Sequence, residues 1–227
     1  MSLPYQFKSD PYSSHSAILA RVGEANGRRA LDVGAADGYL AERLVQKGFE
    51  VLCLERDQAL AATAIAKSLT VIRTDLDEPL PELKGEFDLI VCGDVLEHLK
   101  NPSEVLRRLR TILKADGTMI ISVPNVAHAW IRFQLLLGRF EYTDRGILDR
   151  THLHFYTRSS FRRFLRQEGM EIVEFAAVPV PLPLVVPRKV QGRVFNVVHR
   201  LNAIMARMWS TLFAYQFIAI ARKEAAS

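Results

Sequence analysis

The stretch that most constrains the fold is RALDVGAADGYLAERL, residues 29–44. A short apolar run ends at Asp32 and Gly34, a second glycine follows at Gly38, and apolar residues then recur at helical spacing. This pattern predicts a strand, a tight glycine turn and a helix. Such a turn lets a ligand approach the backbone closely and directs free N–H groups of the helix N-terminus toward it.

The spacing of the glycines restricts the class of ligand. A dinucleotide site has the pattern G-x-G-x-x-G, whereas this chain has D-x-G-x-x-x-G. The pattern resembles the (D/E)-x-G-x-G-x-G motif of class I S-adenosylmethionine (SAM) dependent methyltransferases, with Ala36 at the place of the middle glycine. This resemblance implies that Asp32, Gly34, Ala35 and Gly38 lie under a cofactor that carries no phosphate. The alternative is an ordinary strand-to-helix turn in which the glycines serve close packing.

Two further acids follow predicted strands. The apolar run 49–54 ends at Glu55, 21 residues beyond Gly34, where a carboxylate can accept the hydroxyl groups of a ribose. Asp75 follows the short strand 70–73, and the resemblance implies that it accepts the adenine amino group. The full set of predicted cofactor residues is Asp32, Gly34, Ala35, Gly38, Glu55, Arg56, Asp75, Leu76 and Gly93.

Strands that alternate with helices predict an α/β fold with a parallel sheet covered on both faces. We expect a doubly wound, mostly parallel seven-stranded sheet and, from the resemblance, an antiparallel last strand. The 227 residues suit a single domain. Its expected parts are an N-terminal lid helix within 1–27, a SAM-binding half at 28–123, a substrate insertion at 124–156 and a C-terminal half at 157–227.

The resemblance extends along the chain. LDVGAADG, LERD and FDLIVCGDVLEHL follow the order of the class I methyltransferases, and SVPNVAHAWIRFQLLLGRFEYTD and THLHFYTRSSFRRFL are similar to MetW-like proteins and type 11 and 12 bacterial small-molecule methyltransferases. These motifs imply methyl transfer from SAM to an oxygen, nitrogen or carbon nucleophile. A non-catalytic alternative is a SAM-binding partner subunit of a methionine-biosynthesis acyltransferase. The glycine spacing disfavours a nicotinamide dehydrogenase.

Candidate catalytic residues follow the fourth predicted strand. We predict that Asp94, His98 and His152 lie on the acceptor side, because ligands bind at the carboxyl ends of parallel strands and histidine exchanges protons near neutral pH. Asp94-x-x-Glu97-His98 also resembles an E-x-x-E-H arrangement that, in some methyltransferases, binds a divalent ion with a downstream histidine. The metal candidates are therefore Asp94, Glu97, His98 and His152. No metal is expected, because Asp94 is shorter than the family glutamate and Glu97 and His98 suit a structural role.

Charge differs between the two halves of the chain. Lys and Arg number 11 against 16 Asp and Glu in residues 1–100, and 19 against 9 in residues 101–227. The excess favours an anionic acceptor, with or without a phosphate or lipid link, bound by Arg132, Arg145, Arg150 and His154. A solvated basic surface is the alternative. Nucleic acid is disfavoured, because no aromatic-basic stacking motif accompanies the arginines.

The end of the chain predicts three elements. Alternating prolines in 178–187 predict an extended connector, and 215–221 a closing strand. The helix 194–213 between them carries an apolar stripe formed by Val194, Val197, Leu201, Ile204, Met208 and Leu212. Packing on the domain or in a homodimer is favoured over contact with a membrane surface. Because there is no apolar run of about 18 residues and no signal pattern, we expect a cytoplasmic protein.

Overall fold

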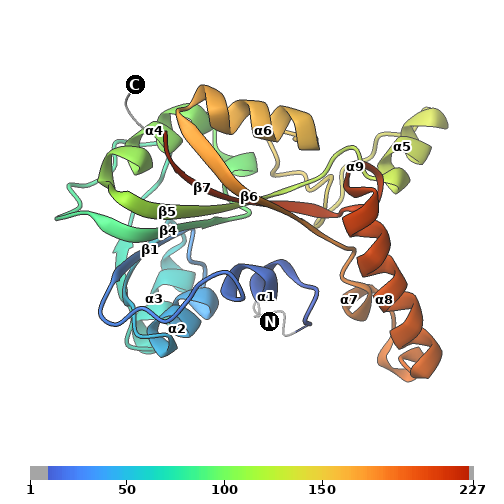
Figure 1. Ribbon diagram of the computed structural model, residues 1–227, viewed down its shortest axis with the longest axis horizontal. Helices are drawn as coiled ribbons and strands as arrows, with labels where there is room; N and C mark the ends of the chain where they lie inside the picture. The colour runs from blue at the N-terminus through green and yellow to red at the C-terminus, as the bar shows by residue number, and fades with distance from the viewer. Residues whose placement is uncertain (1–9, 225–227) are drawn as a thin grey trace.

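A seven-stranded sheet forms the centre of the computed structural model, which describes residues 10–224 (Figure 1). The strands lie in the order β3-β2-β1-β4-β5-β7-β6. Their bounds are β1 Arg29–Val33, β2 Glu50–Glu55, β3 Thr70–Arg73, β4 Phe87–Gly93, β5 Leu113–Pro124, β6 Met170–Val178 and β7 Gln216–Lys223. Strand β7 is antiparallel to both β5 and β6, and all pairings among the strands from β1 to β5 are parallel. The predicted fold class is therefore confirmed.

Helices cover both faces of this sheet (Figure 1). One face carries α4 (Pro102–Ile112) and α6 (Arg158–Gln167), and the other α1 (Ser14–Leu19), α2 (Tyr39–Gln46) and α3 (Gln58–Ala66). The remaining helices are η1 Leu96–His98, α5 Ala129–Leu136, α7 Leu182–Val185, η2 Arg188–Val190, α8 Arg193–Met208 and α9 Ser210–Phe213. No helix within residues 10–224 has the length and apolar character needed to cross a bilayer.

The alternation of side chains along the strands builds one apolar core on each face. On β4, Leu89 and Val91 join the core beneath α2 and α3, whereas Ile90 and Cys92 join the core beneath α4 and α6. Cys53 and Cys92 are free, buried thiols. A central strand buried on both faces accounts for the continuous apolar run in the sequence.

Two segments differ from what their sequence patterns predict. Within residues 10–27, the lid helix expected in 1–27 is limited to α1, and residues 20–25 form a turn and an irregular segment before Asn26 and Gly27, which both have a positive φ. Gly23 within that segment disfavours helix because its backbone loses more conformational freedom than that of other residues. Asp116 and Gly117, a pair typical of turns, lie within β5, where the register shifts between the pairs Phe87 with Leu113 and Leu89 with Thr118.

The segment between β6 and β7 also departs from the prediction. The connector holds one helical turn, α7, and the long helix is interrupted at Trp209, whose φ of −125° and ψ of 63° are not helical. The apolar stripe does not pack on the domain, which was one of the two favoured arrangements, and packing in a homodimer stays a prediction. His199, Ala203 and Ala206 form the buried face of α8, and the stripe residues from Val194 to Met208 are exposed. Small side chains on the buried face suit close approach to the sheet.

Candidate active site

A pocket opens at the carboxyl ends of β1 and β4, beneath α1. Helix α1 contributes one wall, the turn after β1 the floor, and the ends of β4 and β5 the opposite side. The lining residues are Ser14, His15, Ile18, Asp32, Gly34, Ala35, Tyr39, Leu40, Gly93, Asp94 and Ser122. Five of the predicted cofactor and catalytic residues therefore meet in one pocket: Asp32, Gly34, Ala35, Gly93 and Asp94. Helix α1 lies where a lid was predicted.

The turn after β1 depends on backbone conformations that suit glycine. Gly34 has a φ of 70°, and a Cβ atom there would lie 2.7 Å from Cγ2 of Val95. Gly38 has a φ of 81°, and its Cβ would collide with Leu69. Ala36 adopts a φ of 50° between them, so alanine follows the same turn at the cost of some backbone strain. The turn thus tolerates the departure from the family motif.

Asp32 ends up buried at the bottom of the pocket. Its carboxylate is 3% exposed, and Oδ2 has no hydrogen-bond partner among the described residues. Burial raises the pKa of Asp32 to about 7, with the Ala41 backbone opposing this shift and the Glu55 charge adding to it. A buried carboxylate with one oxygen free of hydrogen bonds in a pocket fits a cationic ligand. The sulfonium or ammonium group of SAM has this charge.

Glu55 and Asp75 extend the site along the sheet, at the ends of β2 and β3. The Glu55 carboxylate accepts the backbone N–H of Ala36 at 2.8 Å and that of Asp57 at 2.7 Å. Asp75 lies 3.6 Å from Nη1 of Arg56 in an ion pair. Leu76 beside it is buried. Their contacts with the ribose and the adenine stay predictions.

Asp94 is held by two neighbouring strands. Ser122 Oγ and Gln216 Nε2 each donate to its carboxylate at 2.7 Å, and its φ of 56° lies in the left-handed region. Both oxygens are thus engaged, so Asp94 fixes the loop after β4. Ser122 and Gln216 were missed at the sequence level. The signal for each was a polar residue within an otherwise apolar strand.

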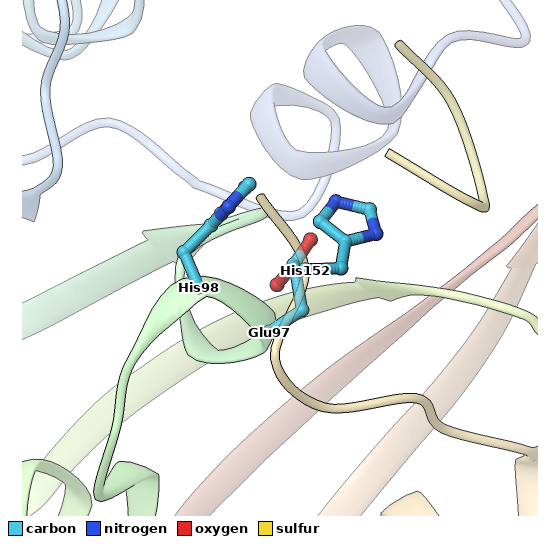
Figure 2. Close-up of side chains that lie close together, drawn as sticks. All are labelled: Glu97, His98 and His152. Atoms are coloured by element: carbon cyan, nitrogen blue, oxygen red, sulfur yellow. The ribbon is translucent and has the colours of Figure 1, made fainter. Parts of the chain in front are cut away.

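Glu97, His98 and His152 gather beside this loop (Figure 2). One potential ligand atom from each lies within 4.8 Å of the others, and the two imidazole centroids are 4.7 Å apart. Glu97 is fully buried, and neither of its carboxylate oxygens has a partner among the described residues. Burial, with the Asp94 and Asp149 charges, holds the pKa of Glu97 well above its usual range.

Hydrogen bonds select the tautomer of both histidines. Nδ1 of His152 lies 3.0 Å from the carbonyl oxygen of Ile147. Nδ1 of His98 lies 3.3 Å from the carbonyl oxygen of Thr151 and 3.0 Å from Thr151 Oγ1, whose own proton is donated to Asp149 at 2.7 Å. A carbonyl oxygen only accepts, so each Nδ1 carries the proton and each Nε2 keeps its lone pair. Burial and the neighbouring His152 lower the pKa of His98. The neutral ring is the form that accepts a proton or binds a metal.

The donor set also fits a divalent cation. Glu97, His98 and His152 would supply one carboxylate and two imidazole ligands, which suit manganese, iron or zinc. A cation there would compensate for the buried, unpartnered carboxylate of Glu97. Asp94, the fourth metal candidate, lies outside this group, and Ser122 and Gln216 each donate to one of its oxygens.

The structure does not bring the predicted acceptor arginines into the pocket. Arg132 donates to the backbone oxygens of Ala127 and Thr211 at 2.6 and 3.5 Å. Arg150 pairs with Asp144 on the surface at 2.7 Å, and Arg145 is exposed. The backbone N–H of His154 donates to the Glu97 carbonyl at 3.1 Å. Roles for these four residues in acceptor binding stay predictions.

A family profile described as a methyltransferase domain matches residues 11–175, which is well over half of the chain. The chain belongs to this methyltransferase family. A ubiquinone biosynthesis O-methyltransferase of Xanthomonas axonopodis pv. citri (strain 306) is 27% identical to the methyltransferase over 169 residues. The match covers 71% of this chain and 70% of that protein. Methyl transfer with SAM as cofactor is thereby confirmed. The comparisons give no support to the acyltransferase-subunit alternative.

Solved structures confirm the fold of the methyltransferase. A SAM-dependent methyltransferase from Archaeoglobus fulgidus superposes with a TM-score of 0.62 and 19% identity, covering 93% of this chain and 95% of that chain. Magnesium protoporphyrin IX methyltransferase from Synechocystis PCC 6803, solved with bound SAH, gives a TM-score of 0.64 and 17% identity. That match covers 94% of this chain and 83% of that chain.

Proposed function

We propose that the enzyme transfers the methyl group of SAM to a hydroxyl oxygen of a small acceptor bound beside Glu97, His98 and His152. The observation that carries this proposal is the position of that cluster. Asp94 lines the cofactor pocket, and the cluster follows within the same loop. The relatives from Xanthomonas and from Acinetobacter baumannii are named O-methyltransferases of ubiquinone biosynthesis, which supports oxygen over nitrogen or carbon.

The residues divide the work between positioning and proton transfer. SAM supplies a methyl group on a positively charged sulfur. Asp32 and the turn from Gly34 to Gly38 hold its charged end, and Glu55 holds the turn. Alignment of the acceptor oxygen with the methyl group then supplies much of the rate enhancement. His98 accepts the hydroxyl proton on Nε2, because its Nδ1 proton is committed to Thr151 and its pKa is lowered.

A divalent cation at the cluster is a second candidate. The unpartnered buried carboxylate of Glu97 favours it. A cation held by Glu97, His98 and His152 would orient and acidify the acceptor hydroxyl.

We also propose that the acceptor of the methyl group is negatively charged. Its contacts would be Arg132, Arg145, Arg150 and His154.

The proposal is tested by incubating the purified enzyme with isotopically labelled SAM and a fractionated small-molecule extract. We expect label to pass into one or a few compounds, and mass spectrometry of these to locate the new methyl group on oxygen. A methyl group found on nitrogen or carbon would contradict the oxygen assignment. Absence of transfer to any fraction, with SAM bound, would favour a binding function over catalysis.

A further inference from the structure

Large apolar side chains that are exposed to solvent concentrate in two insertions. In the described part of the chain, all of them except Val45, Ile65, Leu153 and Val173 lie within residues 130–142 and 184–209. The first segment includes α5, and the second includes α7 and α8. Single exposed apolar side chains are ordinary on a protein surface, whereas a contiguous group of them indicates a surface that binds a partner or a membrane.

Helix α8 has two faces with opposite characters. Its buried face consists of His199, Ala203 and Ala206. The opposite face carries apolar side chains that are 42–78% exposed, namely Val194, Val197, Val198, Leu201, Ile204 and Met208. Successive residues rotate by about 100° around a helix, so this stripe points directly away from the sheet. We call these six residues the α8 stripe.

Positive charge runs beside the α8 stripe. Arg193, Arg200 and Arg207 are exposed and recur every seven residues, so they form one row along an edge of the stripe. Arg188 and Lys189 precede the helix. The sequence has no Asp or Glu between Glu174 and Glu224. The α8 stripe is thus apolar along its middle and cationic along one side, and its own segment of chain contains no acid.

Two contacts fix the orientation of α8. His199 Nε2 lies 2.7 Å from the carboxylate of Asp10, and both side chains are about 10% exposed. Asn202 donates to the carbonyl oxygen of Val180 at 2.9 Å. These bonds hold the helix by its buried face, so the α8 stripe is presented outward.

Both insertions lie at the same end of the sheet as the cofactor pocket. Gln216 at the start of β7 pairs with Pro124 at the end of β5 and with Val178 at the end of β6. Chain segments 125–157 and 179–215 therefore leave the sheet where the parallel strands end. Figure 1 shows α5 and α8 projecting from this end. A surface covering both insertions would lie next to the active site.

We propose that the α8 stripe and its arginine row dock the enzyme on the surface of an anionic lipid bilayer. An amphipathic helix with apolar residues on one face and arginines at its edge places the former among acyl chains and the latter among head groups. A second copy of the chain fits less well. Two stripes packed together would bring arginine rows into proximity with no carboxylate on α8 to pair with them.

Co-sedimentation of the full chain with vesicles tests this proposal. With about one-third phosphatidylglycerol in phosphatidylcholine, we expect binding that weakens as salt rises, and little binding to phosphatidylcholine alone. The triple variant Val197→Ser, Leu201→Ser and Ile204→Ser should bind at least ~10-fold more weakly. The matched control Val45→Ser with Ile65→Ser, on α2 and α3, should bind like the wild type.

The charge contribution is tested in the same assay. Arg193→Gln, Arg200→Gln and Arg207→Gln together should reduce binding and its salt dependence, whereas Arg162→Gln, Arg163→Gln and Arg166→Gln on α6 should not. Equal binding by the wild type and the triple serine variant would overturn the proposal, as would loss of binding with the α6 variant alone. A wild-type dimer that the serine substitutions dissociate in analytical ultracentrifugation would assign the stripe to self-association instead.

Discussion

The carboxylate of Glu55 accepts the backbone N–H of Ala36 at 2.8 Å. This bond joins the end of β2 to the turn after β1, so two motifs that are separate in the sequence form one structure. Ala36 stands where the family motif has a glycine, and it keeps a positive φ of 50°. Glu55 therefore stabilises the turn as well as standing where the ribose is predicted.

Replacement of Glu55 should weaken cofactor binding. Glu55→Ala removes the acceptor for two backbone N–H groups and the predicted ribose contact. We expect SAH affinity to fall ~10- to 100-fold, since hydrogen bonds to a charged group contribute about 1.5–3 kcal/mol. Calorimetric titration measures the change. Glu50→Ala, at the exposed start of the same strand, is the matched control, and equal affinity for both variants would refute this role.

Gly38 should be far less tolerant of alanine than Gly23. A Cβ atom at Gly38 would collide with Leu69 and lie 3.2 Å from Cβ of Ala64, and the φ of 81° disfavours side chains. We expect Gly38→Ala to lower the free energy of unfolding by about 1–3 kcal/mol. Gly23 has open space around it, so Gly23→Ala should be neutral or slightly stabilising. Urea denaturation compares them, and similar midpoints would contradict the packing of the turn.

SAM binding should expel a proton from Asp32. The pKa of Asp32 is raised to about 7 by burial without ligand, and a cation beside the carboxylate lowers it. SAM affinity should therefore rise about 5-fold from pH 6 to pH 7 and level off above about pH 8. The free energy of unfolding of the ligand-free protein should fall as the pH rises from 4 to 7, because the folded state binds the Asp32 proton more tightly than the unfolded state does. Asp32→Asn should abolish the pH dependence of SAM binding and reduce the loss of stability, to which the raised pKa of Glu97 also contributes. SAM binding that is independent of pH in the wild type would disprove the linkage.

A divalent cation should stabilise the folded enzyme through Glu97. Adding manganese or zinc to metal-free protein should raise the thermal midpoint by a few degrees, since a ligand that binds only the folded state stabilises it. Glu97→Gln keeps the shape of the side chain but removes its charge, so its midpoint should not respond to metal. An equal rise in both proteins would place the ion elsewhere, and no rise in either would leave His98 as the acceptor-side base.

Local patterns predicted much of the cofactor site. The glycine turn and the acids after β2 and β3 each depend on short stretches of chain, because parallel strands bring their carboxyl ends to one edge. The family resemblance suggested that His98 and His152 meet. Their geometry depends on bonds that the sequence does not specify, such as those from the Leu153 and His154 N–H groups to the Glu97 carbonyl at 2.7 and 3.1 Å.

Periodicity located the apolar stripe of α8 but did not determine what the stripe contacts. Hydrophobic spacing identifies a face of a helix, and it does not identify what that face contacts. Ala203 and Ala206 approach the rest of the protein closely because they are small, and His199 is buried through its bond to Asp10. The buried face is thus less apolar than the exposed one, which explains why the stripe was not the face that packs on the domain.

The role of His98 as the acceptor-side base is tested most directly by the rate of methyl transfer from labelled SAM by His98→Ala, measured beside SAH affinity. We expect a loss of ~100-fold or more in turnover, because a general base has been removed, with SAH affinity within about twofold of the wild type. His128→Ala, at the N-cap of α5, should retain the wild-type rate. Undiminished turnover by His98→Ala would contradict the role of His98 as the general base. Parallel losses of turnover and SAH affinity would mean that His98 supports the fold of the pocket instead.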